Sequence, residues 1–230
     1  MLDDTLVLDT WSSGSGRTSP VLSLLALARP ELDAARRGDL AGDEANRSLL
    51  DAMAELGEHS LDTLVACPRC DEPNEVVLPL DVLRAAVDGP STGSVAVGGT
   101  TVPYRVPSVA DLEAARRCTD ADAAERLLVD RCTGGEVDRS ALAAVAAEID
   151  ERHPLLAPRV EVRCVSCAAA FDAGLDVAVV AGASVAAAAT RLVDEVAHLA
   201  RAYGWSEAEV LAVPRARRAV YRRLIDDGLL

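Results

Sequence analysis

The stretches LDTLVACPRC (residues 61–70) and RVEVRCVSC (residues 159–167) decide how this chain is organised. Each ends in two cysteines separated by two residues, the spacing at which a tight turn presents two thiolates to one metal ion. Two such turns facing each other supply a tetrahedral shell of four sulfurs. The sequence therefore predicts one structural zinc ion, Zn²⁺, with four ligands: Cys67, Cys70, Cys164 and Cys167.

The two cysteine motifs lie in equivalent surroundings. An extended run precedes each motif, and further extended runs are predicted after them at residues 75–80 and 171–179. Superposing Cys70 on Cys167 brings these runs into register, so each motif belongs to a unit of strand, turn and strand. Because the two halves are far apart in the chain, the pattern predicts a split zinc ribbon.

Other uses of the cysteines fit the sequence less well. The CPRC spelling resembles that of thiol oxidoreductases, but those motifs open a helix, whereas residues 71–74 predict a turn into a strand. Bridging the long segment between Cys70 and Cys164 should cost about 4 kcal/mol of closure entropy. Apparent zinc binding in small finger peptides contributes about 10 to 16 kcal/mol, so a zinc ion can offset this cost. Iron in a rubredoxin-like site stays an alternative, because ligand spacing does not separate it from zinc.

Composition argues against a nucleic-acid-binding protein. The chain of 230 residues has a formal net charge of -14, a pI of about 4.6 and no lysine, and only 3% of its residues are aromatic. Nucleic-acid phosphates would repel such a chain, and few rings are left for stacking on bases. A hydrophobic content of 50% is enough for a buried core built from Leu, Val and Ala.

The sequence indicates a cytoplasmic protein. Its start, MLDDTLVLDT, is acidic where a signal peptide requires positive charge before the apolar run. The most apolar stretch, residues 177–189, is shorter than the roughly 20 residues of a membrane span, so no membrane association is expected. In a reducing compartment, paired cysteines favour metal ligands over disulfides.

The expected fold class is α+β, with the split zinc ribbon, a further β-hairpin around Gly98-Gly99, inserted helices and a C-terminal helical unit. Helices are predicted from Pro20, over residues 43–56 and over residues 140–150. Four regions follow: a flexible N-terminal segment (1–19), N-terminal helices (20–60), the split zinc-ribbon domain with its helical insertion (61–180) and the C-terminal helical unit (181–230).

Two helix starts carry a capping-box signature. Ser108 is followed three residues later by Asp111, and Ser206 is followed by Glu209. In this motif the first side chain accepts a backbone N–H three residues on, and the acidic side chain accepts the N–H of the first residue. Pro214 can start the last helix in the same region.

The remaining cysteines and histidines form no recognisable catalytic set. Cys118 and Cys132 lie in predicted helices and are interpreted as buried structural thiols, while His59 and His153 adjoin element boundaries. No nucleophile elbow, phosphate-binding loop or metalloprotease motif accompanies them. No catalytic residue, enzymatic activity or small-molecule substrate is therefore assigned.

The C-terminal region is a candidate partner-binding surface. It concentrates arginines in an acidic chain and holds most of the aromatic residues, and aromatic and Arg side chains are enriched at interfaces. The residues assigned to binding are Trp205, Arg215, Arg218 and Arg222, with Arg218 and Arg222 expected to be exposed. A solvated helix face and a packed helical corner remain the alternatives.

Several motifs together resemble a known family. They are CPRC, PSVADLEAA (residues 107–115), VRCVSC and the tail HLARAYGWSEAEVLAVPRARRAVYRRL (residues 198–224). The order is similar to that of the baseplate hub assembly chaperones of T-even-type phages and related contractile injection systems. Two departures are that CVSC lacks the proline of CPRC and that neither motif is followed by glycine.

The resemblance implies an assembly role. The expected function is that of a zinc-binding assembly factor or component for the baseplate or hub of a contractile tail, with baseplate or hub proteins as partners. The alternative is a zinc-ribbon regulatory protein that binds nucleic acid or the transcription machinery, which the acidic balance disfavours.

Overall fold

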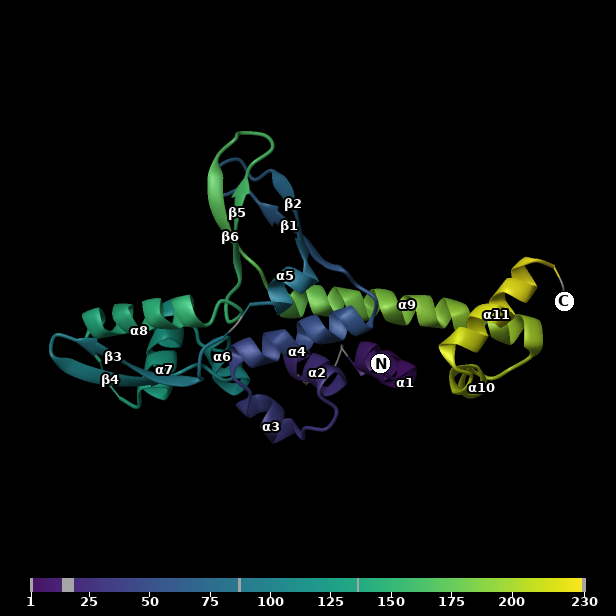
Figure 1. Cartoon of the computed structure of the whole chain (residues 1–230), viewed down its shortest axis with the longest axis horizontal. Helices are drawn as coiled ribbons and strands as arrows, with labels where there is room; N and C mark the ends of the chain where they lie inside the picture. The colour runs from purple at the N-terminus through teal and green to yellow at the C-terminus, as the bar shows by residue number, and fades with distance from the viewer. Residues whose placement is uncertain (1, 14–18, 87, 136, 229–230) are drawn as a thin grey trace.

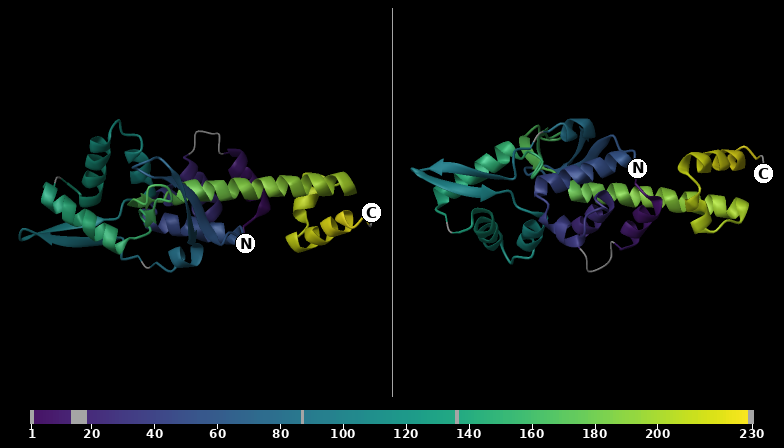
Figure 2. Two further views of the ribbon diagram at one scale, coloured as in Figure 1. Left: turned by 90° about the horizontal axis from the view of Figure 1, so that it is seen from above. Right: turned by 60° about the horizontal axis from the view of Figure 1, so that its bottom comes forward.

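The computed structural model describes residues 2–13, 19–86, 88–135 and 137–228. Over these ranges the chain forms eleven helices and three two-stranded antiparallel sheets, which confirms the expected α+β class (Figure 1). The molecule is elongated, with one long helix running through it and an arm of four strands standing away from the helical body (Figures 1 and 2).

Four helices precede the first strand: α1 (Asp4–Ser13), α2 (Pro20–Ala28), α3 (Ala34–Asp39) and α4 (Gly42–Glu55). The expectation of a flexible segment over residues 1–19 is corrected at α1, while residues 14–18 lie outside the described residues. The side chain of Asp3 accepts the backbone N–H groups of Thr5 and Leu6 and so caps α1. Val7 is completely buried, and its burial contributes about 1.5 to 3 kcal/mol.

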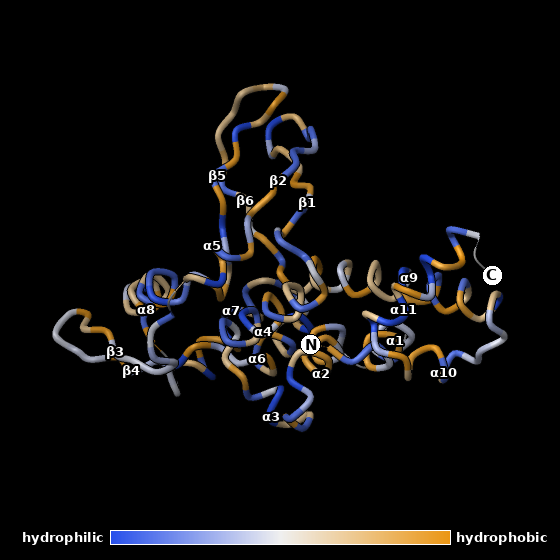
Figure 3. The backbone as a smooth tube through the Cα atoms, turned by 45° about the vertical axis from the view of Figure 1, so that its right-hand side comes forward, coloured by the Kyte–Doolittle hydropathy of each residue, from blue (hydrophilic) through white to orange (hydrophobic). Residues whose placement is uncertain are grey.

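The arm consists of two hairpins. Strand β1 (Ser60–Ala66) pairs with β2 (Pro73–Pro79), and β5 (Arg159–Arg163) pairs with β6 (Ala170–Gly174). The predicted repeat is confirmed in the register, because Ala66 faces Pro73 in the first hairpin as Arg163 faces Ala170 in the second. The two hairpins lie side by side in the arm, and along it hydrophobic and hydrophilic segments alternate (Figures 1 and 3).

A second lobe lies between the two hairpins in sequence. It follows the short helix α5 (Leu80–Arg84) and contains β3 (Thr92–Val97), β4 (Thr100–Arg105), α6 (Val109–Ala115), α7 (Ala121–Thr133) and α8 (Arg139–Arg152). Gly98 and Gly99 both have positive φ, as the predicted tight hairpin turn requires. A small core of its own, including Val102, Tyr104 and Val145, joins the β3–β4 hairpin to α8.

The C-terminal part begins earlier than the sequence indicates. Strand β6 stops at Gly174, and Asp176 caps a 27-residue helix, α9 (Val177–Tyr203), by accepting the Val179 N–H. The expected extended run to residue 179 is therefore wrong, because the N-cap carboxylate favours helix over strand at this point. Helix α9 also crosses the expected boundary at residue 180 and is followed by α10 (Glu207–Ala212) and α11 (Arg215–Asp226).

Helix α9 is also longer than the apolar stretch that the sequence singles out. Of the described helices, it alone is long and apolar enough to cross a membrane by length and composition, a test that core helices of soluble proteins also pass. Its buried residues, among them Val185, Ala189 and Leu199, face the protein interior. The helix packs against α1, α2 and α4 and forms one side of the main core.

Both predicted capping boxes are confirmed. The Ser108 hydroxyl accepts the Asp111 N–H, and the Asp111 carboxylate accepts the Ser108 N–H at the start of α6. Ser206 and Glu209 form the same pair of hydrogen bonds at the start of α10. These motifs connect residues only three apart, so local sequence is enough to define them.

Candidate metal centre

The first cysteine turn is closed by two backbone hydrogen bonds. The Cys67 N–H donates to the Glu72 carbonyl at 2.9 Å, and the Asp71 N–H donates to the Cys67 carbonyl at 2.8 Å. Asp71 has a φ of 61°, a left-handed conformation that glycine usually provides. The missing glycine noted in the sequence thus does not prevent the turn.

The second cysteine turn repeats this geometry. The Cys164 N–H donates to the Ala169 carbonyl at 2.9 Å, and the Ala168 N–H donates to the Cys164 carbonyl at 3.0 Å. Ala168, which follows Cys167 as Asp71 follows Cys70, has a φ of 57°. Two turns of the same shape therefore face each other at the end of the arm, although their sequences differ.

The four cysteines predicted as ligands lie close together in the structure. Their sulfur atoms all lie within 4.8 Å of one another, with 3.7 Å between Cys67 and Cys167 and 3.6 Å between Cys70 and Cys164. A metal ion with four bonds of about 2.3 Å requires tetrahedral sulfur separations of about 3.8 Å. The separations of 3.6 and 3.7 Å are thus compatible with one tetrahedral ion. They are too long for a disulfide, in which the two sulfur atoms are about 2 Å apart.

The pKa values of two of these thiols are shifted in opposite directions. The pKa of Cys164 is lowered to about 6, mainly because the backbone N–H of Cys167, assisted by that of Ser166, stabilises its thiolate. At Cys70 the Glu72 N–H favours the thiolate, but the thiol of Cys167, burial and the other cysteines outweigh it and raise its pKa to about 12. A metal cation bound by the four sulfurs would remove this conflict, because it would stabilise all four thiolates together.

A polar contact that sequence reasoning missed also joins the two turns. Asn74 is 2% exposed, its amide donates to the Glu72 carbonyl at 2.7 Å, and its Oδ1 accepts the Val165 N–H at 2.9 Å. The sequence marks Asn74 only as the end of a turn. The second unit has Phe171 at the position that matches Asn74. A polar residue in one unit where the other has an aromatic residue was the sequence signal that could have indicated a special role for Asn74.

The other two cysteines lie away from this cluster. Cys132 is buried in α7, and burial raises its pKa to about 11, which keeps it protonated. Cys118 is partly buried, and its sulfur approaches the Ala114 carbonyl at 3.7 Å. Both positions agree with the interpretation of these residues as structural thiols.

The expected exposure of Arg218 is wrong. Its side chain is 1% exposed and lies between two carboxylates, donating to Asp4 at 2.5 Å and to Glu195 at 3.0 Å. It also donates to the Val213 carbonyl at 2.8 Å. The sequence around Arg218 does not reveal this burial, because its carboxylate partners come from distant elements, α1 and α9.

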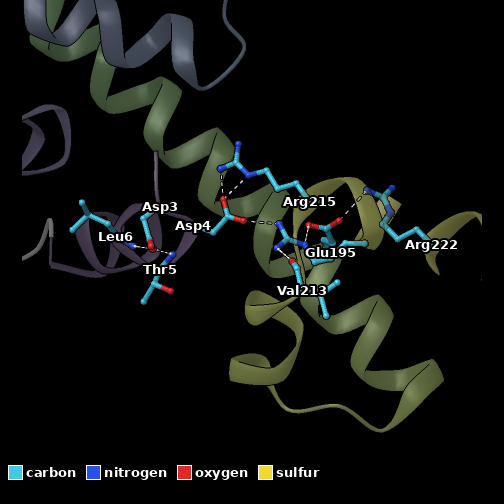
Figure 4. Close-up of polar contacts among 9 residues, drawn as sticks. Asp3, Asp4, Thr5, Leu6, Glu195, Val213, Arg215 and Arg222 are labelled. Carbon is cyan, nitrogen blue, oxygen red and sulfur yellow. Dashed lines mark hydrogen bonds and ion pairs between the residues drawn. The ribbon is translucent and has the colours of Figure 1, made fainter. Parts of the chain in front are cut away.

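The other arginines assigned to binding differ in accessibility. Arg215 is 38% exposed in its side chain and also pairs with Asp4 (Figure 4). Arg222 is 51% exposed and lies 4.0 Å from Glu195. Arg222 therefore remains a candidate contact residue, while Arg215 and Arg218 hold α11 to the N-terminal helix.

Trp205 belongs to a packed aromatic corner. Its ring stacks on Tyr203 with centroids 4.7 Å apart and meets Tyr221 edge-on at 5.2 Å. Tyr203 and Tyr221 also contact each other edge-on, so the three rings join the end of α9 to α11. All three remain partly exposed, so the cluster serves packing and still presents aromatic surface.

Comparison with known proteins identifies no relative: no family model, no curated protein and no solved structure matches this chain.

Proposed function

We propose that the four-cysteine cluster binds one zinc ion and that the two hairpins form a split zinc ribbon. Support comes from the sulfur separations of 3.6 and 3.7 Å and from the equal geometry of the two turns. Four thiolates complete a tetrahedral shell and leave no position for substrate, so the ion has a structural role. It links segments 94 residues apart.

We further propose that the chain is a binding or assembly protein acting on the baseplate or hub of a contractile tail. The observation that supports an assembly role is the four-cysteine cluster in an arm that stands away from the body (Figure 1), where a bound ion would close the centre. Such a centre fixes an extended shape without performing chemistry. The baseplate assignment itself rests on the resemblance of CPRC, VRCVSC and the tail at residues 198–224.

The proposed contact surface on the C-terminal unit consists of Trp205, Arg217 and Arg222. Trp205 is partly exposed, and both arginines are exposed on α11. In a chain of net charge -14, α11 carries five arginines and one acidic residue, which suits an acidic patch on the partner. Arg215 and Arg218 support it by fixing α11 against Asp4.

Affinity capture from cells that express the contractile-tail genes of the same genome tests the assignment. We expect baseplate or hub proteins to be recovered with the parent chain and to be reduced with the double variant Arg217→Glu, Arg222→Glu. Arg117→Glu, at an exposed position just after α6, is the matched control and should capture as the parent does. Recovery of RNA polymerase or nucleic acid would support the regulatory alternative.

A further inference from the structure

A second group of metal-ligand residues lies where the two lobes meet. Asp43 is in the first turn of α4, Asp88 follows α5, and His153 ends α8. Asp43 is 4% exposed and His153 is 1% exposed, and the side chain of Asp88 is 11% exposed. Each residue offers one ligand atom, and these three atoms lie within 4.8 Å of one another.

Asp43 orients the imidazole of His153. Its Oδ2 lies 2.6 Å from His153 Nδ1, while its Oδ1 accepts the Glu44 N–H at 2.9 Å. A carboxylate is an acceptor, so Nδ1 carries the proton and the neutral ring keeps a lone pair on Nε2. That Nε2 is buried and has no hydrogen-bond partner, which is a costly state for a polar atom.

Only one of the two carboxylate oxygens of Asp88 has a hydrogen-bond partner. Its Oδ2 pairs with Arg47, which also donates to the carbonyls of Arg84 and Ala86, but its Oδ1 is buried without a partner. Two carboxylates and one guanidinium give this buried group a net charge of about -1 when the imidazole is neutral. Two buried lone pairs and excess negative charge together favour a cation over an empty site.

We propose that Asp88 and His153, through the partnerless Asp88 Oδ1 and His153 Nε2, bind a divalent transition-metal ion such as Zn²⁺ at a second metal site, which Asp43 supports from Nδ1 of the imidazole. Imidazole nitrogen and carboxylate oxygen are common zinc ligands, and a carboxylate on the far nitrogen of a ligating histidine is the usual supporting contact. Water completes the shell from a hollow of about 400 Å³ that Asp43, Arg47 and Asp88 line.

This ion fastens the second lobe to the main body. Near it, Gly89 donates its N–H to the Arg152 carbonyl at 2.8 Å, and Asn46 donates to the Leu155 carbonyl at 2.7 Å. The contacts join α4 and the segment after α5 to the end of α8 and the turn that follows it, so a bound ion adds a third link across the same junction.

The test is a metal count on the reduced, full-length chain, stripped of metal, dialysed against Zn²⁺ alone and analysed by elemental mass spectrometry. We expect Asp88→Asn, which keeps the shape and an acceptor for Arg47, to bind one ion fewer than the parent. Glu44→Gln changes an equally charged residue that lines the same hollow but lies outside the three-residue group, and it should bind as many ions as the parent. Equal counts for the parent and Asp88→Asn would overturn the proposal.

Cobalt separates the two sites in the same protein. Thiolate-bound Co²⁺ gives strong charge-transfer absorption. Asp88→Asn should keep that band and lose only the second, weakly absorbing Co²⁺ ion. Addition of Zn²⁺ should raise the melting temperature of the parent more than that of Asp88→Asn. His153→Gln is the second variant and should lose the same equivalent. If a folded His153→Gln chain kept the full count, the site would be refuted.

Discussion

The side-chain oxygen of Asn74 accepts the backbone N–H of Val165 at 2.9 Å, across 91 residues of sequence. It connects the first hairpin to the turn that carries Cys164 and Cys167, independently of any metal–thiolate bond. Because Asn74 also donates to the Glu72 carbonyl, one buried side chain fixes both turns relative to each other. This contact thus helps to arrange the four cysteines for the proposed zinc ion.

Replacing Asn74 by Ala should reduce both stability and metal affinity. The variant loses the hydrogen bonds of a buried side chain to Val65, Glu72 and Val165, and we expect a loss of about 1 to 3 kcal/mol in the free energy of unfolding. Urea unfolding measures it. Glu75→Ala, at the exposed neighbouring position, should change stability by no more than about 0.5 kcal/mol. Equal stability of both variants would show that the Asn74 contact is unimportant in solution.

Replacing Cys164 by Ser should release the zinc ion of the arm and lower the melting temperature sharply. Three thiolates cannot complete the tetrahedral shell, and the link between the two halves of the chain is lost. Co²⁺ absorption and calorimetry follow the two effects. Cys118→Ser is the matched control and should keep the charge-transfer band. An unchanged band in Cys164→Ser would remove this residue from the ligand set.

Charge reversal should cost much more stability at the buried Arg218 than at the exposed Arg222, one turn further along α11. Arg218→Glu places a third carboxylate beside Asp4 and Glu195 in a buried position, and we expect a loss of about 3 to 5 kcal/mol. Arg222→Glu changes an exposed side chain and should cost about 0.5 kcal/mol. Chemical denaturation compares them. Similar losses for the two variants would mean that Arg218 is solvated.

Acid should weaken the second lobe through Asp111. Burial alone would raise its pKa, but Arg105, the N–H and hydroxyl of Ser108, and Arg131 together hold the pKa well below its usual range. A carboxyl whose pKa is depressed by folding stabilises the protein above its unfolded pKa, near 4, and loses that contribution as pH falls toward the folded pKa.

The expected result is that Asp111→Asn is less stable than the parent at pH 7 and that the difference narrows below about pH 4. Unfolding free energies measured from pH 7 to pH 2 provide the comparison. Asp150→Asn, at an exposed site on α8, should follow the parent curve. A difference between Asp111→Asn and the parent that stayed constant down to pH 2 would contradict this role for Asp111.

Local sequence alone determined a large part of this protein. The cysteine spacing, the matching strands around it, the two capping boxes and the Gly98-Gly99 turn involve residues close in the chain, so their patterns predict their geometry. The superposition of Cys70 on Cys167 also predicted the common register of the two hairpins. These features depend on backbone conformations that a few neighbouring residues select.

The tertiary structure decided the features that depend on distant partners. Arg218 is buried because Asp4 and Glu195 reach it from α1 and α9, and α1 is held to the body by the burial of Val7. His153 acquires its partner Asp43 from 110 residues away. Burial and charge pairing depend on which segments pack together, and the free energy of that packing comes from the whole core, so the local pattern around a single residue does not contain it.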